Sequence, residues 1–219
     1  MASQEERSIR IQAHGVEIRG DLVVPDGARA IVVFAHGSGS SRHSPRNRYV
    51  AQGLHEGGIA TLLIDLLTEE EERVDERTRQ HRFDIDLLAR RLEAALDWVY
   101  EQPDLSALPA GLFGASTGAG AALIAAAHRP DRVGAVVSRG GRPDLAGDAL
   151  DDVRAATLLI VGERDPVVID LNEQAFRRLP ESAELEIVPA ASHLFEEEGA
   201  LEVVIRSARD WFEANLVER

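Results

Sequence analysis

Residues 111–120 read GLFGASTGAG, and this stretch indicates how the chain folds. Within it, Gly114-x-Ser116-x-Gly118 has the spacing of a nucleophile elbow, a sharp turn that leads from a strand into a helix. Such a turn is crowded, and glycines two residues before and two after the serine relieve the crowding. The helix that follows would direct its positive N-terminal end toward the serine Oγ. The pattern therefore predicts that Ser116 is a nucleophile.

The same letters allow two other interpretations. Gly114-x-x-x-Gly118-x-Gly120 resembles the dinucleotide-binding turn of short-chain dehydrogenases, but it lies past the middle of the chain instead of after the first strand. Those enzymes also use a Tyr-x-x-x-Lys pair, whereas this chain has 24 arginines and no lysine. The remaining alternative is a glycine-rich turn between a strand and a helix that has no chemical role.

The composition excludes several further classes of function. A chain without lysine has no Walker A loop and no Schiff-base or pyridoxal-phosphate anchor. Without cysteine it has no disulfide, no thiolate nucleophile and no cysteine-bound metal. The net charge of −14 disfavours binding to a phosphate backbone. His193 with Glu196 and Glu197 lacks the H-E-x-x-H spacing of a zinc site. From these observations together we expect no metal, no cofactor and no nucleic-acid partner.

Strand and helix patterns alternate along the chain, which is typical of an α/β fold with a mostly parallel sheet and helices on both faces. Two short runs at 8–13 and 16–24 predict an N-terminal antiparallel hairpin. Further strands are predicted at 30–35, 59–64, around 112–113, and at 133–138, 156–161 and 185–188. The charged stretch 69–79 is interpreted as an exposed loop or the start of a helix. The sequence shows no low-complexity linker, internal repeat or change of composition, so we expect a single domain over residues 1–219. Only 139–155 separate two strands after the elbow, which are too few residues for a lid domain.

Two polar side chains after the last two predicted strands complete a candidate triad with Ser116. Asp165 follows the first of these strands and His193 follows the second. Ligands in open α/β sheets bind beyond the carboxyl ends of the strands, and a serine, acid, histidine order is expected after an elbow. Glu163 or Asp170 could be the acid instead, and Asp165 could cap the next helix. We predict Asp165 as the acid and His193 as the base.

Backbone and arginine groups supply the other candidate site residues. A tetrahedral intermediate needs two N–H donors, and we assign them to Thr117, after the nucleophile, and to Ser38, in the glycine-rich turn after the 30–35 strand. Five arginines follow strand ends and could bind a carboxylate or phosphate of the substrate, or else form surface ion pairs: Arg42, Arg46, Arg48, Arg139 and Arg142. Among them we place Arg139 in the substrate pocket.

Five motifs along nearly the whole chain resemble the dienelactone hydrolase-like branch of the α/β-hydrolase fold. They are HGSGSSRHSPRN, GASTGAG, VSRGGRPDLAG, VGERDPVV and ASHLF, in the order of that family. The resemblance implies a carboxylic-ester hydrolase with Ser116 as nucleophile, Asp165 as acid, His193 as base, and Ser38 and Thr117 as oxyanion donors. Dienelactone hydrolases proper use a cysteine at the elbow, so the serine favours a general esterase that acts on small esters or lactones.

Two other functions remain open: a non-catalytic hydrolase-fold module that binds a small ligand, and a hydrolase of phosphorus esters. The N-terminal residues lack the pattern of a signal peptide, and the longest apolar run is shorter than a membrane span. We therefore expect a cytoplasmic protein whose partner is a small-molecule ester and not a membrane.

Overall fold

An eight-stranded mixed sheet organises the computed structural model, which describes residues 6–218. Its strand order is β1-β2-β4-β3-β5-β6-β7-β8. The hairpin of β1 (Glu6–Ala13) and β2 (Val16–Val23) is antiparallel, and β2 also pairs antiparallel with β4. All other pairings are parallel, between β3 (Ala30–Ala35), β4 (Ile59–Ile64), β5 (Ala110–Ala115), β6 (Val133–Arg139), β7 (Ala156–Gly162) and β8 (Glu184–Val188).

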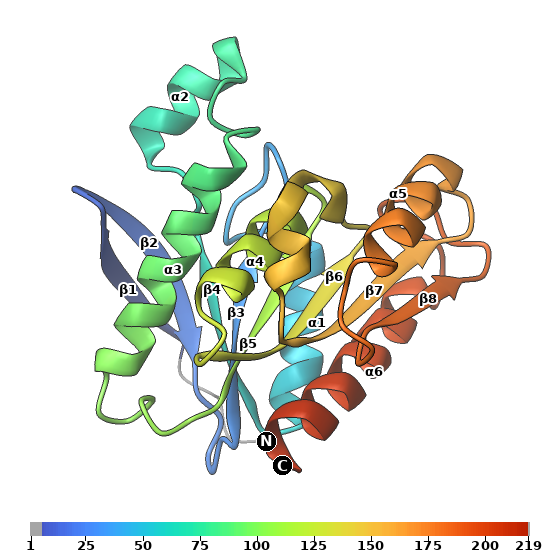
Figure 1. Cartoon of the computed structure of the whole chain (residues 1–219). Helices are drawn as coiled ribbons and strands as arrows, with labels where there is room; N and C mark the ends of the chain where they lie inside the picture. Colours follow the sequence, from blue (N-terminus) through green and yellow to red (C-terminus); the bar gives the residue numbers. More distant parts are fainter. Residues whose placement is uncertain (1–5, 219) are drawn as a thin grey trace.

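Helices cover both faces of this sheet (Figure 1). One apolar cluster joins the sheet to α3 (Ile85–Glu101), α4 (Thr117–His128) and α5 (Pro166–Phe176), and a second joins it to α1 (Pro45–Glu56) and α6 (Ala200–Phe212). Side chains of a strand alternate between faces, so Ile31 and Val33 of β3 enter the first cluster while Val32 and Phe34 enter the second. No helix within 6–218 is long and apolar enough to cross a membrane.

The predicted fold class is confirmed, including the N-terminal hairpin and the helices on both faces, and the described residues add no lid domain. The charged stretch after β4 forms a helix, α2 (Glu69–Thr78), which extends away from the sheet (Figure 1). A capping box starts this helix, because Thr68 Oγ1 accepts from the Glu71 amide while the Glu71 carboxylate accepts from the Thr68 amide. The 139–155 segment contains short 3-10 turns over Pro143–Asp152.

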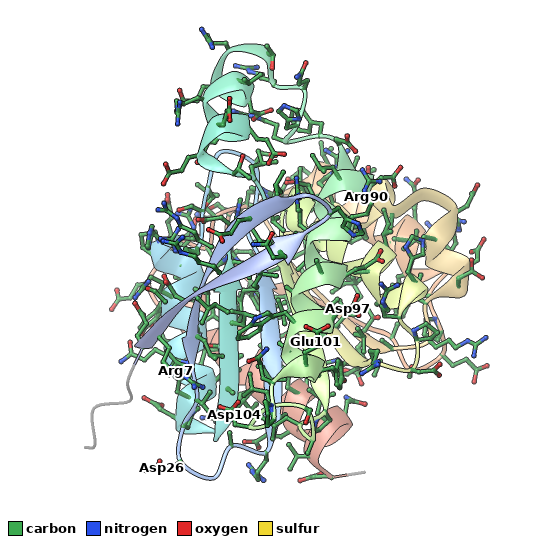
Figure 2. All side chains as sticks on the ribbon, turned by 90° about the vertical axis from the view of Figure 1, so that its left-hand side faces the viewer. Arg7, Asp26, Arg90, Asp97, Glu101 and Asp104 are labelled. Carbon is green, nitrogen blue, oxygen red and sulfur yellow. The ribbon has the colours of Figure 1, made fainter. Side chains whose placement is uncertain are left out.

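The side of the molecule with the hairpin and α3 carries many charged side chains (Figure 2). Arg90, Asp97 and Glu101 point outward from α3. Arg7 of the hairpin lies 3.1 Å from Asp104, which follows this helix. The carboxyl ends of the parallel strands meet along another edge of the sheet, and the candidate site is found there.

Candidate active site

Ser116 lies in a strained turn between β5 and α4. Its φ is 50° and its ψ is −122°, which is unusual for a residue with a side chain. A Cβ on Gly114 would lie 2.4 Å from the Ala119 Cα, and one on Gly118 would lie 2.4 Å from the Ala35 carbonyl oxygen. The turn therefore needs glycine at both positions. Ser116 occupies the N-cap position of α4 without a capping hydrogen bond, so its Oγ is not used to hold the helix.

Asp165 and His193 lie together at the ends of β7 and β8. The His193 Nδ1 is 2.6 Å from the Asp165 Oδ2. Asp165 stands at the N-cap position of α5, but its side chain makes no capping hydrogen bond. Of the two alternative acids, Glu163 accepts from the Ala190 amide at 2.7 Å, and Asp170 is exposed on α5. Of the three carboxylates, the one that contacts His193 is thus Asp165; its role as the acid stays a prediction.

Ser116 and His193 line one pocket of about 180 Å³, here called the serine pocket. Its other walls include Ser38, Ser44, Arg46 and Arg139. Among residues 6–218 no hydrogen bond joins the Ser116 Oγ to His193. Hydrogen bonds between catalytic groups are often long in the free enzyme and tighten when substrate binds. The shared pocket therefore places Ser116 and His193 where a bound substrate would reach both side chains.

Two carboxylates hold the loop that carries His193. Glu197 accepts from the Ser192 amide at 3.0 Å and from the Ser192 hydroxyl at 3.3 Å. The Ser192 amide keeps the pKa of Glu197 below its usual range. The Glu163 contact to Ala190 fixes the other side of the loop, where Ala190 has a φ of 59°. Sequence reasoning weighed Glu197 only as a metal ligand and missed this contact, because a glutamate in an acidic run gives no sign of which amide it will meet.

The two predicted oxyanion donors lie next to each other. The Ser38 Oγ is 3.0 Å from the Thr117 Oγ1. Within the described chain, neither the Ser38 nor the Thr117 amide N–H has a hydrogen-bond acceptor. The turn that carries Ser38 approaches Ser116 closely, since a Cβ on Gly37 would lie 3.1 Å from the Ser116 Cβ. Both N–H groups are therefore available to an oxygen bound beside Ser116.

His36 positions this turn, and sequence reasoning missed its role. Its Nδ1 donates to the Gly37 carbonyl at 2.9 Å, and its Nε2 accepts from the Leu66 amide at 3.0 Å. The Leu66 contact requires the neutral ring, because only an unprotonated Nε2 can accept a hydrogen bond. Burial lowers the pKa of His36 and so favours this neutral form. The signal in the sequence is a histidine between a buried strand and a glycine-rich turn.

The structure places the five candidate arginines differently. Four of them form ion pairs: Arg42 with Asp21 and Asp65, Arg46 with Glu196, Arg48 with Asp21, and Arg142 with Asp144. Two of the five, Arg46 and Arg139, line the serine pocket. Arg139, the arginine predicted to be in the substrate pocket, is the last residue of β6 and is buried.

A second pocket of about 110 Å³, here called the acidic pocket, lies between the Ser38 turn and α2. Its charged lining residues are Asp65, Glu72, Asp75, Glu76 and Arg82. Burial and the nearby carboxylates raise the pKa of Glu72. Ser38 and Thr117 line it as well, so the candidate oxyanion donors border this pocket while Ser38 also borders the serine pocket.

Comparison with known proteins agrees with this architecture. The family described as "Alpha/beta hydrolase domain" matches residues 28–207. A dienelactone hydrolase from Anabaena variabilis, known from a crystal structure, is 59% identical with a TM-score of 0.95, over 97% of this chain and 99% of that chain. Est1E from Butyrivibrio proteoclasticus with bound ferulic acid has a TM-score of 0.80 at 16% identity, over 94% of this chain and 98% of that chain, which shows the fold alone.

A curated relative carries a different name. "Putative phosphoribosyl transferase Rv0571c" of Mycobacterium tuberculosis is 58% identical over 207 residues, which are 94% of this chain but 46% of the relative. The chain thus spans about half the length of the curated relatives that it matches. The family match and the Anabaena relative confirm the resemblance seen in the five motifs. The chain belongs to the alpha/beta hydrolase family, and within it to the dienelactone hydrolase-like branch.

Proposed function

We propose that this chain is a serine hydrolase that cleaves small carboxylic esters or lactones through an acyl-enzyme on Ser116. The observation that carries the proposal is the His193–Asp165 pair, 2.6 Å apart, beside the pocket that Ser116 also lines. A base held by a carboxylate next to an uncommitted hydroxyl is the arrangement that activates a serine.

In the first half of the reaction, the Ser116 Oγ attacks the ester carbonyl while the His193 Nε2 takes its proton. Asp165 accepts from the Nδ1–H and so holds the ring in the tautomer that leaves Nε2 free as a base. The Ser38 and Thr117 amides donate to the oxygen on which negative charge develops. Each such donor is typically worth about 10²–10³ in kcat.

Acylation is complete when the intermediate collapses: the bond from the carbonyl carbon to the alcohol oxygen breaks, His193 gives its proton to that oxygen, and the acyl group stays on Ser116. A water molecule then loses a proton to the His193 Nε2 and attacks the acyl carbonyl. Collapse of the second intermediate releases the acid and restores the serine hydroxyl. Every proton transfer in this scheme runs through His193, while Asp165 orients its ring and the two amides stabilise the oxyanion.

The size of the two pockets favours small substrates. They measure about 180 Å³ and 110 Å³, whereas sites for drug-sized ligands occupy roughly 300–1,000 Å³. We assign the acyl and alcohol parts of the ester to these two pockets, on either side of the Ser38 turn. Arg139 remains a proposed substrate contact.

The name of the Mycobacterium tuberculosis relative fits this proposal if its two parts have separate activities. The alpha/beta hydrolase family covers residues 28–207 of this chain, and the chain matches 46% of the relative. We propose that the matched part is the hydrolase and that the activity in the printed name belongs to the remainder. The cytoplasmic location and the single-domain extent over residues 1–219 stay predictions.

The test replaces the nucleophile and measures hydrolysis of p-nitrophenyl acetate. Ser116→Ala is expected to lose at least about 10³-fold in kcat while it keeps the circular dichroism spectrum of the parent. Ser106→Ala, at an exposed serine remote from the site, is the matched control. A fluorophosphonate probe should label Ser116, as located by mass spectrometry. Unchanged turnover in Ser116→Ala, or labelling of another serine, would contradict the proposal.

Two assays address the other functions. Inertness toward a panel of short esters, thioesters and lactones, together with no probe labelling, would favour a binding module without catalysis. Faster turnover of a phosphate triester than of any carboxylic ester would favour a hydrolase of phosphorus esters.

A further inference from the structure

Arg139 is a buried cation without a carboxylate partner. Its side chain runs from the end of β6 into the serine pocket, and the residue is 7% exposed. Within residues 6–218 its Nε and Nη1 have no hydrogen-bond partner, and its Nη2 reaches the Asn47 Oδ1 at 3.4 Å. A buried charge is costly unless it is paired. Arg42, Arg48 and Arg142 all meet this need with carboxylates, so Arg139 is the exception among these strand-end arginines.

Arg46 brings a second positive charge to the same pocket. Its Nη1 lies 3.1 Å from the Glu196 Oε1, but the Glu196 side chain is 64% exposed, and such surface pairs contribute little. The Arg46 Nε is buried and has no partner in the described chain. Burial and the nearby Arg46 together lower the pKa of Arg139 to about 10, so the guanidinium is still charged at neutral pH.

The remaining walls also favour an anion. Helix α1 begins beside the pocket, with Ser44 as its N-cap, and the N-terminus of a helix attracts negative charge. Ser40 and Ser44 add hydroxyl groups. None of the described residues that line the serine pocket is acidic, although the chain contains 38 Asp+Glu and has a net charge of −14.

The acidic pocket on the other side of the Ser38 turn has the opposite charge. Glu72, Asp75 and Glu76 line it together with a single arginine, Arg82, which pairs with Asp75. A negatively charged group would be repelled there and attracted to Arg139 and Arg46. The contrast between the two pockets orients a substrate that carries an anion at one end.

We propose that Arg139 and Arg46 bind a phosphate group of the substrate, so that the ester cleaved at Ser116 carries a phosphomonoester on the part that enters the serine pocket. This inference rests on the proposed esterase function and names its substrate class. Two guanidinium groups are balanced by a dianion, whereas a carboxylate supplies one negative charge. The unpartnered nitrogens come from two side chains, and a tetrahedral phosphate offers three terminal oxygens to them and to the serine hydroxyls.

The first experiment measures binding without relying on hydrolysis. Inorganic phosphate and acetate are titrated into the full chain by calorimetry at constant ionic strength. Phosphate should bind at least about ten-fold more tightly than acetate, and Arg139→Met should weaken phosphate binding by at least about ten-fold. Arg46→Met keeps the test decisive if Arg139→Met does not fold, and should weaken phosphate binding by about three- to ten-fold. Arg90→Met, which removes an exposed cation on α3, is the control (Figure 2).

The second experiment measures substrate selectivity. The ratio of kcat/KM for 2-(phosphonooxy)ethyl acetate to that for 2-methoxyethyl acetate should fall at least about ten-fold in Arg139→Met, fall less in Arg46→Met, and stay constant in Arg90→Met. The proposal is overturned if acetate binds as tightly as phosphate, if 3-acetoxypropanoate is preferred over the phosphorylated ester, or if the ratio and the phosphate affinity do not change in Arg139→Met. Lack of hydrolysis of every ester would instead refute the esterase proposal, and the phosphate titration would still test the anion site.

Discussion

His193 Nδ1 lies 2.6 Å from Asp165 Oδ2, and this contact joins the loop after β8 to the end of β7. Asp165 also stands at the N-cap position of α5, yet its carboxylate makes no capping hydrogen bond to the helix. A helix start of this kind usually uses its polar side chain as a cap. The Asp165 carboxylate thus contacts the histidine instead of the first amides of α5.

Asp165→Asn is therefore expected to reduce kcat for p-nitrophenyl acetate by about 10²–10⁴-fold with little loss of stability. The asparagine amide can donate to Nδ1 and would then favour the tautomer in which Nε2 carries the proton and cannot act as a base. Asp170→Asn, an exposed carboxylate on the same helix, is the matched control and should keep wild-type turnover. Full activity in Asp165→Asn, or an equal loss in Asp170→Asn, would assign the acid elsewhere.

The features that were predicted well depend on residues that lie close together in the sequence. The continuous apolar run 30–35 is a buried strand because every side chain on both of its faces meets a helix layer. The glycines around Ser116 are required by contacts with Ala119 and Ala35, which follow directly from a tight turn between a strand and a helix. For the charged stretch after β4 the sequence left a loop or the start of a helix open, and the structure shows a helix that begins with a capping box of Thr68 and Glu71.

The division of the arginines could not be predicted from sequence. The sequence predicted the same position for all five candidates, after a strand end, whereas their roles depend on whether a carboxylate from another element reaches them. Arg42 meets Asp65 from the end of β4, and Arg48 meets Asp21 from β2, so both become structural ion pairs. Arg139 meets the amide of Asn47 on α1 instead. Such partners are set by the tertiary fold, which short-range patterns do not encode.

The close contact of Gly118 with β3 gives a prediction about stability. An alanine Cβ at this position would lie 2.4 Å from the Ala35 carbonyl oxygen and 2.6 Å from that of His36. Both are backbone atoms at the end of a buried strand and cannot move alone. Gly118→Ala should lower the free energy of unfolding by about 1–3 kcal/mol or more, and it should reduce ester turnover because the displaced segment leads into the Ser38 turn.

Urea denaturation with a matched glycine variant checks this expectation. Gly57→Ala would bring a Cβ within 2.9 Å of the Arg209 Cδ and the Glu213 Oε1, but these are the ends of flexible surface side chains that can move away. Gly57→Ala should therefore change the unfolding free energy much less than Gly118→Ala. Equal stability of the two variants would show that the backbone around Gly118 can shift to make room for a Cβ.

His55 predicts how stability depends on pH. It lies on α1 with its Nε2 2.7 Å from the Thr61 Oγ1 of β4, and burial lowers the pKa of His55 from 6.5 to about 4. Because the unfolded chain binds this proton more readily, the contribution of His55 to stability is fully present above about pH 6.5 and is lost as the pH falls toward about 4. His36, whose pKa is also lowered, acts in the same direction.

His55→Gln removes the titrating ring but can still hydrogen-bond to Thr61, so its unfolding free energy should fall less between about pH 7 and pH 5 than that of the wild type. Urea denaturation at several pH values in this window measures the two slopes. His14→Asn is the matched control: it removes an exposed histidine from the hairpin turn, where its φ of 51° suits asparagine, and should keep the wild-type slope. If His55→Gln and His14→Asn lose stability equally as the medium is acidified, then the buried ring on α1 does not control the acid sensitivity of the fold.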